Sequence, residues 1–174
     1  MASRSIDMRQ LTLCLLLGLG ACTTAPPPAA PLAPPAPPPP PPPVVSGDWR
    51  DWPLTPGSWQ YLPGSPVSSA RYGDARTAQF IVRCDAVARR VTIMRAGTAA
   101  EFTITTSSRT ARFPAGHIDE SGAAMSGVIL NATDAFLDEL VFSRGRIAVQ
   151  SPGLVSLAIP AWAEPARAIE DCRK

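Results

Sequence analysis

The sequence contains a single histidine and a single lysine among its 174 residues, and these shortages exclude several kinds of catalytic site. Metal sites are usually built from clusters of histidine and cysteine, and His117 stands alone. A Ser-x-x-Lys acyl enzyme is excluded because the one lysine is Lys174, the last residue given. Glycine-rich phosphate loops and Gly-x-Ser-x-Gly nucleophile elbows are also missing. A serine triad would have to use His117 as its base, and its neighbours predict an exposed turn there.

The chain also lacks a large excess of positive or negative charge. The chain has 16 Lys and Arg against 14 Asp and Glu, a formal net charge of +2 at pH 7. Nucleic-acid-binding proteins concentrate positive charge on one surface. We therefore expect no nucleic-acid partner. We also expect no metal and no bound cofactor.

No apolar run reaches the ~20 residues that a membrane-spanning helix needs. The longest, residues 11–19, has the length of the apolar region of a signal peptide. It leads into Leu19-Gly20-Ala21-Cys22, which resembles the lipobox of bacterial lipoproteins. The resemblance implies that residues 1–21 are a removed signal peptide and that Cys22 carries a covalent lipid that holds the chain on a membrane. The alternative is an ordinary cleaved signal peptide followed by a chance cysteine.

The resemblance also implies a location. In Gram-negative lipoproteins, an aspartate directly after the lipidated cysteine favours retention in the inner membrane. Thr23 and Thr24 follow Cys22 in this sequence. We therefore expect a lipid-anchored protein of the cell envelope, at the outer membrane and facing the periplasm.

A proline-rich segment follows the lipobox. Residues 26–43 contain 13 prolines in 18 positions, a composition that favours a semi-rigid polyproline II helix. At ~3.1 Å per residue this segment would span roughly 55 Å. We interpret residues 22–45 as the lipidated cysteine and a tether, and residues 46–174 as one periplasmic, β-rich domain. The alternative for the prolines is a ligand for a groove on a partner protein.

The lipobox resemblance determines which of the four cysteines are available for a disulfide. Cys14 lies in the expected signal peptide, and Cys22 is expected to be lipidated. The remaining two, Cys84 and Cys172, form an even pair in an oxidising compartment. We expect them to form a disulfide, although two buried free thiols are the alternative.

Hydrophobic alternation with a period of two predicts antiparallel strands over residues 79–84, 90–95 and 101–105, joined as a meander, with a further strand over 109–113. Residues 117–125 read as a loop, and 133–142 as a short helix with Thr133 as its cap. Two more strands should point Ile147, Val149, Val155, Leu157 and Ile159 inward. A C-terminal helix should begin with Pro165 in its first position and carry Cys172 on its inner face. The fold class is therefore α+β and mostly β: an antiparallel meander, sandwich or partly open barrel, with the C-terminal helix pinned by the disulfide.

Two groups of residues are candidates for a ligand surface. Three tryptophans, Trp49, Trp52 and Trp59, fall within eleven residues and could form an exposed platform for a glycan or peptide. The alternative is that their rings cover the core. Several arginines gather around the predicted meander and are expected on its outer face, where they could bind an anion or simply aid solubility. The candidates are Arg83, Arg90 and Arg95.

Three short segments of the domain are distinctive: Phe80–Asp85, Phe142–Arg146 and Ile169–Arg173. With them the domain resembles small lipoproteins of alphaproteobacteria, a family with no assigned activity. We expect a non-enzymatic binding or structural module whose partner is an envelope protein or a cell-wall glycan. An alternative is an inhibitor of a cell-wall hydrolase, because lipid-anchored lysozyme inhibitors are also small, disulfide-bonded β domains. Their Ser-Gly-x-Arg-Tyr type loop is matched here only by Ser68-Ser69-Ala70-Arg71-Tyr72. A hydrolase is the third alternative.

Overall fold

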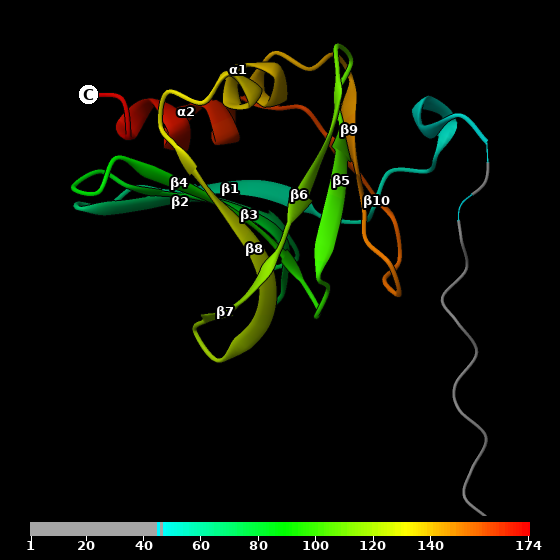
Figure 1. Ribbon diagram of the computed structural model, residues 1–174, viewed down its shortest axis with the longest axis horizontal. Helices are drawn as coiled ribbons and strands as arrows, with labels where there is room; N and C mark the ends of the chain where they lie inside the picture. The colour runs from blue at the N-terminus through cyan, green and yellow to red at the C-terminus, as the bar shows by residue number, and fades with distance from the viewer. Residues whose placement is uncertain (1–44, 46) are drawn as a thin grey trace, which may run out of the picture. The chain divides into compact units, whose positions relative to one another are not determined.

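The computed structural model describes residue 45 and residues 47–174 (Figure 1). The expected signal peptide, Cys22 and the proline-rich segment lie outside the described residues. Within them the chain forms two antiparallel sheets, two α-helices and a short 3₁₀-helix, η1 (Trp49–Asp51). This architecture confirms the α+β, mostly β class. No helix in the described ranges combines the length and apolar character that crossing a membrane requires.

The larger sheet has six strands in the order β1-β2-β3-β4-β8-β7. Its first four strands follow one another along the chain as an antiparallel meander, in which the predicted pairing of β3 with β4 is confirmed and β1 and β2 are additional strands. Their bounds are β1 (Ser58–Leu62), β2 (Val67–Gly73), β3 (Ala78–Asp85) and β4 (Arg90–Ala96), and the sheet is completed by β7 (Gly116–Glu120) and β8 (Ala123–Asn131).

The smaller sheet has four strands in the order β10-β9-β5-β6. Its members are β5 (Glu101–Thr105), β6 (Thr110–Pro114), β9 (Arg146–Gln150) and β10 (Leu157–Pro160).

The predicted meander is wrong in one respect, because β5 does not pair with β4 and lies in the second sheet. The connection between them bonds to β8 instead. Gly97 has a φ of 95°, and its N–H donates to the carbonyl oxygen of Ala124. The hydroxyl of Ser126 accepts from the N–H of Ala99 and donates to the Gly97 carbonyl. These bonds turn the chain away from β4 and direct it into the smaller sheet.

The predicted loop over residues 117–125 is also wrong, because this region is the β7–β8 hairpin. Its turn consists of Ser121 and Gly122, both with positive φ, which suits the twist of a two-residue hairpin. The carboxylate of Asp119 accepts a hydrogen bond from the Gly122 N–H at 2.8 Å. Ile118 lies opposite Met125 across the hairpin, so an apolar pair holds the two strands together.

One main core lies between the sheets, and it is filled by the inward residues of both. The predicted alternation is confirmed in β3, β4, β5 and β9, where every second residue enters this core. Val155 was expected to point inward but is 50% exposed, because β10 begins only at Leu157. The main inward residues are Phe80, Val82, Val91, Ile93, Phe102, Ile104, Ile147, Val149, Leu157 and Ile159.

The two helices begin at positions slightly different from those predicted. Helix α1 (Ala135–Val141) is capped by Asp134 rather than Thr133, because the Asp134 carboxylate accepts from the Phe136 N–H at 2.9 Å. Helix α2 (Ala163–Asp171) contains Pro165 as its third residue rather than its first. Helix α2 packs against β1, β2 and β3 and contacts α1. Both helices therefore cover the same end of the core (Figure 1).

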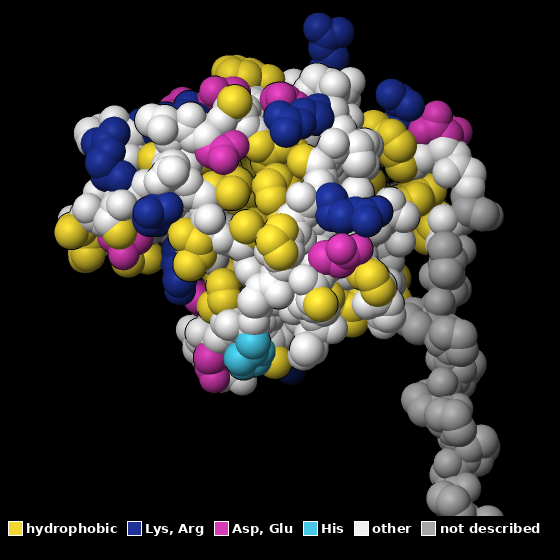
Figure 2. All heavy atoms as spheres, in the orientation of Figure 1, with side chains coloured by type: hydrophobic (Ala, Val, Ile, Leu, Met, Phe, Trp, Pro, Cys, Tyr) yellow, Lys and Arg dark blue, Asp and Glu magenta, His cyan; other side chains and the backbone are white. Residues whose placement is uncertain are grey.

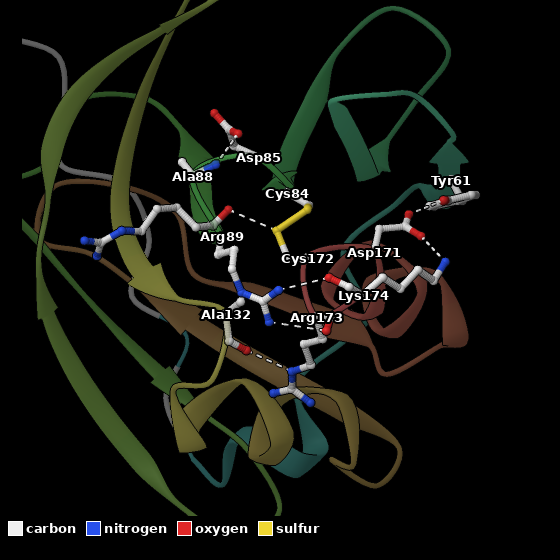
Figure 3. Close-up of a disulfide and its surroundings, with 11 residues drawn as sticks. Tyr61, Cys84, Asp85, Ala88, Arg89, Ala132, Asp171, Cys172, Arg173 and Lys174 are labelled. Carbon is white, nitrogen blue, oxygen red and sulfur yellow. Dashed lines mark hydrogen bonds and ion pairs between the residues drawn. A yellow bond between two sulfur atoms is a disulfide. The ribbon is translucent and has the colours of Figure 1, made fainter.

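The predicted disulfide is confirmed: Cys84 of β3 is bonded to Cys172, the residue that ends α2 (Figure 3). Both cysteines are buried in the main core. Polar contacts reinforce this attachment. Arg89 donates to the carbonyl oxygens of Arg173 and Lys174, and the hydroxyl of Tyr61 donates to the carboxylate of Asp171 (Figure 3). The C-terminal segment is thus fixed to the sheet by one covalent bond and several hydrogen bonds.

Candidate functional site

The three tryptophans do not form an exposed platform. Trp59 is buried in the main core, where its indole N–H donates to the Pro160 carbonyl at 2.8 Å. Trp52 is buried against Ala148 and Ala158 on the outer face of the smaller sheet, and Trp49 is half-buried beside it. The alternative interpretation, rings that cover apolar surface, holds for Trp52 and Trp59. A flat sugar-stacking surface is therefore ruled out as a shared role for the three.

The three candidate arginines do not share a surface either. Arg83 lies on the outer face of the larger sheet, where it forms an ion pair of 2.7 Å with Glu120. Arg90 is exposed. Arg95 was expected on the outer face, but it lies in phase with Val91 and Ile93 on the inner face and is only 3% exposed. The outer-face prediction is therefore wrong for Arg95. Its side chain follows Val91 and Ile93 on the inner face of β4, beyond the hydrophobic residues of the core.

Arg95 lies in the wall of an apolar groove of about 570 Å³. We define this groove by residues 45, 52–56, 79, 95–96 and 155–158. Its rim carries two large apolar side chains that are open to solvent, Leu54 at 49% exposure and Val155 at 50%. Its volume lies in the range of roughly 300–1,000 Å³ that is usual for small-molecule sites. The groove is the best-formed candidate for a binding site among the described residues.

One wall of the groove is the segment 52–56, which passes along the edge of β10 before the chain enters β1. Thr55 holds it there: its N–H donates to the Ala158 carbonyl, and its hydroxyl accepts from the Ala158 N–H, both at 2.9 Å. The Thr55 carbonyl accepts from the hydroxyl of Tyr72 at 2.6 Å, and the Pro56 carbonyl from Gln79 at 3.1 Å. The wall is therefore tied to both sheets. Prolines on either side of Leu54-Thr55 restrict the backbone further.

The electrostatics of the groove are set by hydrogen-bond donors without acceptors. Arg95 donates through Nη2 to the Val155 carbonyl at 2.7 Å, while its buried Nε and Nη1 have no partner. The indole nitrogen of Trp52, another residue of the groove, is buried without a partner as well. Burial lowers the pKa of Arg95 to about 10, so the side chain remains a cation at neutral pH. The groove therefore combines an apolar lining with buried N–H groups, on Arg95 and Trp52, that have no hydrogen-bond acceptor.

A second apolar area lies on the face of the molecule that carries β6 and β8, below α1 (Figure 2). The partly buried hydrophobic residues of these strands, Phe113, Val128 and Leu130, pack directly against the main core. This area is the rim of the core where the two sheets diverge. None of the buried side-chain atoms without a partner among the described residues belongs to β6 or β8.

The residues considered for catalysis are not assembled into a site. His117 is exposed on β7 and lies opposite Ser126, whose hydroxyl is engaged with backbone groups of residues 97 and 99. Across residue 45 and residues 47–174, no three His, Cys, Asp or Glu side chains gather in a way that could hold a metal ion.

Sequence reasoning missed the groove because its walls come from five separate stretches of the chain. One signal was available: alternation places Arg95 in phase with Val91 and Ile93, which predicts an inward arginine at the end of β4. No family model matches the chain, and neither the curated proteins nor the solved structures gave a match.

Proposed function

We propose that the chain is a lipid-anchored, non-enzymatic binding module of the bacterial cell envelope, and that the apolar groove is its binding site. The anchor rests on the sequence around Cys22. The binding site rests on one observation of the structure: an open apolar groove is lined by residues that carry three buried donors without acceptors, on Arg95 and Trp52. Unpaired buried polar groups cost free energy, so a fold that keeps them beside an open groove is suited to a ligand that supplies the missing partner.

The groove favours an apolar partner over a cell-wall glycan. Sugars are bound by exposed aromatic faces and many polar groups, whereas Trp52 and Trp59 are buried and the lining is mostly apolar. Nothing in the described chain favours the inhibitor of a cell-wall hydrolase. Ser68 and Tyr72, the ends of the segment that resembles an inhibitory loop, are buried within β2 and do not project toward a partner.

The proposed tether ends beside this site, because Val45 belongs to the groove. A ligand held there would lie close to the point at which the domain is attached. This supports a role in which the anchor and the site act together, with the anchor fixing where the groove operates.

Binding can be tested with the chain from residue 22 that carries Cys22→Ser, which has no lipid. A neutral solvatochromic dye such as Nile red should bind saturably and increase its fluorescence. Ser156→Trp should fill the groove and abolish most of the increase. The matched control is Val87→Trp, which introduces the same side chain at a position that is 82% exposed in the β3–β4 turn. An increase that survives Ser156→Trp, or that both variants lower equally, would reject the groove as the site.

The anchor needs a separate test, in a bacterial host that processes lipoproteins. The chain with Cys22 should incorporate a labelled fatty acid and fractionate with membranes, and Cys22→Ser should do neither. Cys14→Ser is the matched control, because that residue lies before the expected cleavage site and its loss should leave labelling unchanged. Labelling that persists in Cys22→Ser would refute the lipid anchor.

A further inference from the structure

We propose that the groove binds a free long-chain carboxylate, with the acyl chain along the apolar lining and the carboxylate on the guanidinium of Arg95. This inference rests on the proposal that the groove is a binding site, and it adds the chemical class of the ligand.

The chemistry of the ligand's head group is inferred from the missing hydrogen-bond partners and counterion of Arg95. A guanidinium presents five N–H donors in a planar fork, and here one nitrogen has a partner, the Val155 carbonyl. None of the ion pairs among the described residues involves Arg95, although its side chain is almost fully buried. A buried cation without a counterion is unfavourable, and a carboxylate can accept two parallel hydrogen bonds from the fork.

The third unpartnered atom, the indole nitrogen of Trp52, is also a donor. All the buried side-chain atoms of the groove residues that have no partner are thus donors, which favours a ligand that brings acceptors. A ligand with an ammonium head would place donors against donors and positive charge against Arg95.

The inference that the rest of the ligand is an acyl chain, and not a peptide, comes from the groove lining and from the edge of β10. A peptide would need partners for its own N–H and C=O groups, and edge strands usually supply them by strand addition. At the groove, the N–H and the C=O of Ala158 are both bonded to Thr55. The lining is mostly apolar and therefore offers few partners to a peptide backbone, whereas an acyl chain needs none.

Access to the head-group site requires a small movement. Nε and Nη1 of Arg95 are buried, and the neighbouring Nη2 is bonded to the carbonyl of Val155 in the connection before β10. Entry of the ligand would shift this connection and exchange the Val155 carbonyl for a carboxylate oxygen. Val155 is half-exposed and precedes β10, so it can move without breaking a strand pair.

The experiment measures displacement of Nile red from the unlipidated chain by dodecanoate and by dodecanol, which has the same tail without charge. Dodecanoate should bind at least about tenfold more tightly than dodecanol. Within the series octanoate, decanoate and dodecanoate, each added CH₂ should tighten binding about fourfold. Equal binding of the acid and the alcohol would overturn the proposal.

Two variants test whether Arg95 binds the carboxylate. Arg95→Met should remove the preference for dodecanoate and keep dodecanol binding, which also shows that the variant is folded. Arg90→Met makes the same change at an exposed position of the same strand and should leave the preference intact. Dodecanoate binding that is unchanged in Arg95→Met would also overturn the proposal.

The outcomes separate this inference from the proposed function. If the dye and dodecanol bind in the groove and Ser156→Trp abolishes both, but the carboxylate has no advantage, only the ligand class fails. If neither the dye nor any amphiphile binds in the groove, the proposed function fails with it. An apolar peptide that displaces the dye more tightly than dodecanoate would replace the acyl ligand with a protein partner.

Discussion

Thr55 and Ala158 lie side by side and exchange two hydrogen bonds, one from the Thr55 N–H to the Ala158 carbonyl and one from the Ala158 N–H to the Thr55 hydroxyl. The threonine side chain thus takes the place of a second strand at the edge of β10. It satisfies backbone groups that would otherwise be left unpaired beside the groove, and it holds one groove wall in position.

Thr55→Val keeps the shape of this side chain and removes the acceptor. The N–H of Ala158, which belongs to a buried residue, would lose its partner, so we expect a loss of about 1–3 kcal/mol in the free energy of unfolding. Urea denaturation measures the change, and hydrogen exchange at the Ala158 amide locates it. Thr55→Ser retains the hydroxyl and should recover most of the loss. Equal destabilisation by Val and Ser would show that the hydroxyl is not the important group.

The Cys84–Cys172 disulfide should contribute more stability than any one hydrogen bond, because it closes a loop across 88 residues. The chain-entropy model gives at most about 4–5 kcal/mol for a loop of this length. Replacing both cysteines with alanine should therefore lower the melting temperature under non-reducing conditions. In the presence of a reductant the variant and the parent should melt much closer together. Equal melting temperatures without reductant would contradict this role.

Asp171 should make stability depend on pH in the acid range. Hydrogen bonds from Lys174, and then from the hydroxyl of Tyr61, lower the pKa of Asp171 to about 2. A carboxylate with a lowered pKa in the folded state stabilises the fold above its unfolded pKa, near 4, and loses that contribution as the pH falls towards about 2. Asp171→Asn should therefore cost about 1 kcal/mol at pH 7 and progressively less between about pH 4 and pH 2.

Urea denaturation at several pH values gives the comparison for Asp171. Tyr61→Phe removes one of the two donors and should give an intermediate pH dependence. A difference between Asp171→Asn and the parent that stays constant from pH 7 to pH 2 would argue against this assignment.

Gly127 of β8 should not tolerate a side chain. A Cβ at this position would lie 2.4 Å from Cδ1 of Ile118, 3.0 Å from Cγ of Met94 and 3.1 Å from the Ile93 carbonyl oxygen. We expect Gly127→Ala to destabilise the protein by about 1–3 kcal/mol. Ile118→Val deletes the nearest of these atoms, so Gly127→Ala should cost less in that background. Denaturant unfolding of the four members of this double-mutant cycle gives the coupling. Strict additivity would contradict the steric cause.

The sequence was sufficient for those parts of the fold that follow from local periodicity. Alternation located β3, β4, β5 and β9 and the inward faces of Val91 and Ile93, because a half-buried strand must alternate. The partner of a strand is not a local property. The pairing of β5 with β9 depends on Gly97 and Ser126, which turn the chain away from β4, and neither residue belongs to a recognisable hairpin motif.

The candidate site was harder to predict than the fold. A tryptophan-rich composition does not determine whether a ring faces solvent. The ring of Trp52 is buried because it packs against Ala148 and Ala158, which are distant in the sequence. Arg95 could have been placed inward by its phase with Ile93, but burial of a lone arginine runs against the usual preference of charged residues for the surface. A residue that breaks this preference is informative about function only when its surroundings are known.

The position of the disulfide also determines the order in which the domain can be completed. A chain that emerges from its N-terminal side presents Cys84 long before Cys172, because α2 follows all the other described elements and the two cysteines are 88 residues apart. Until then β2, β3 and β4 can already pair with one another, while the thiol of Cys84 stays unprotected. Oxidation of this pair therefore requires that Cys172 has reached β3, and a molecule interrupted before α2 would keep Cys84 as a free thiol.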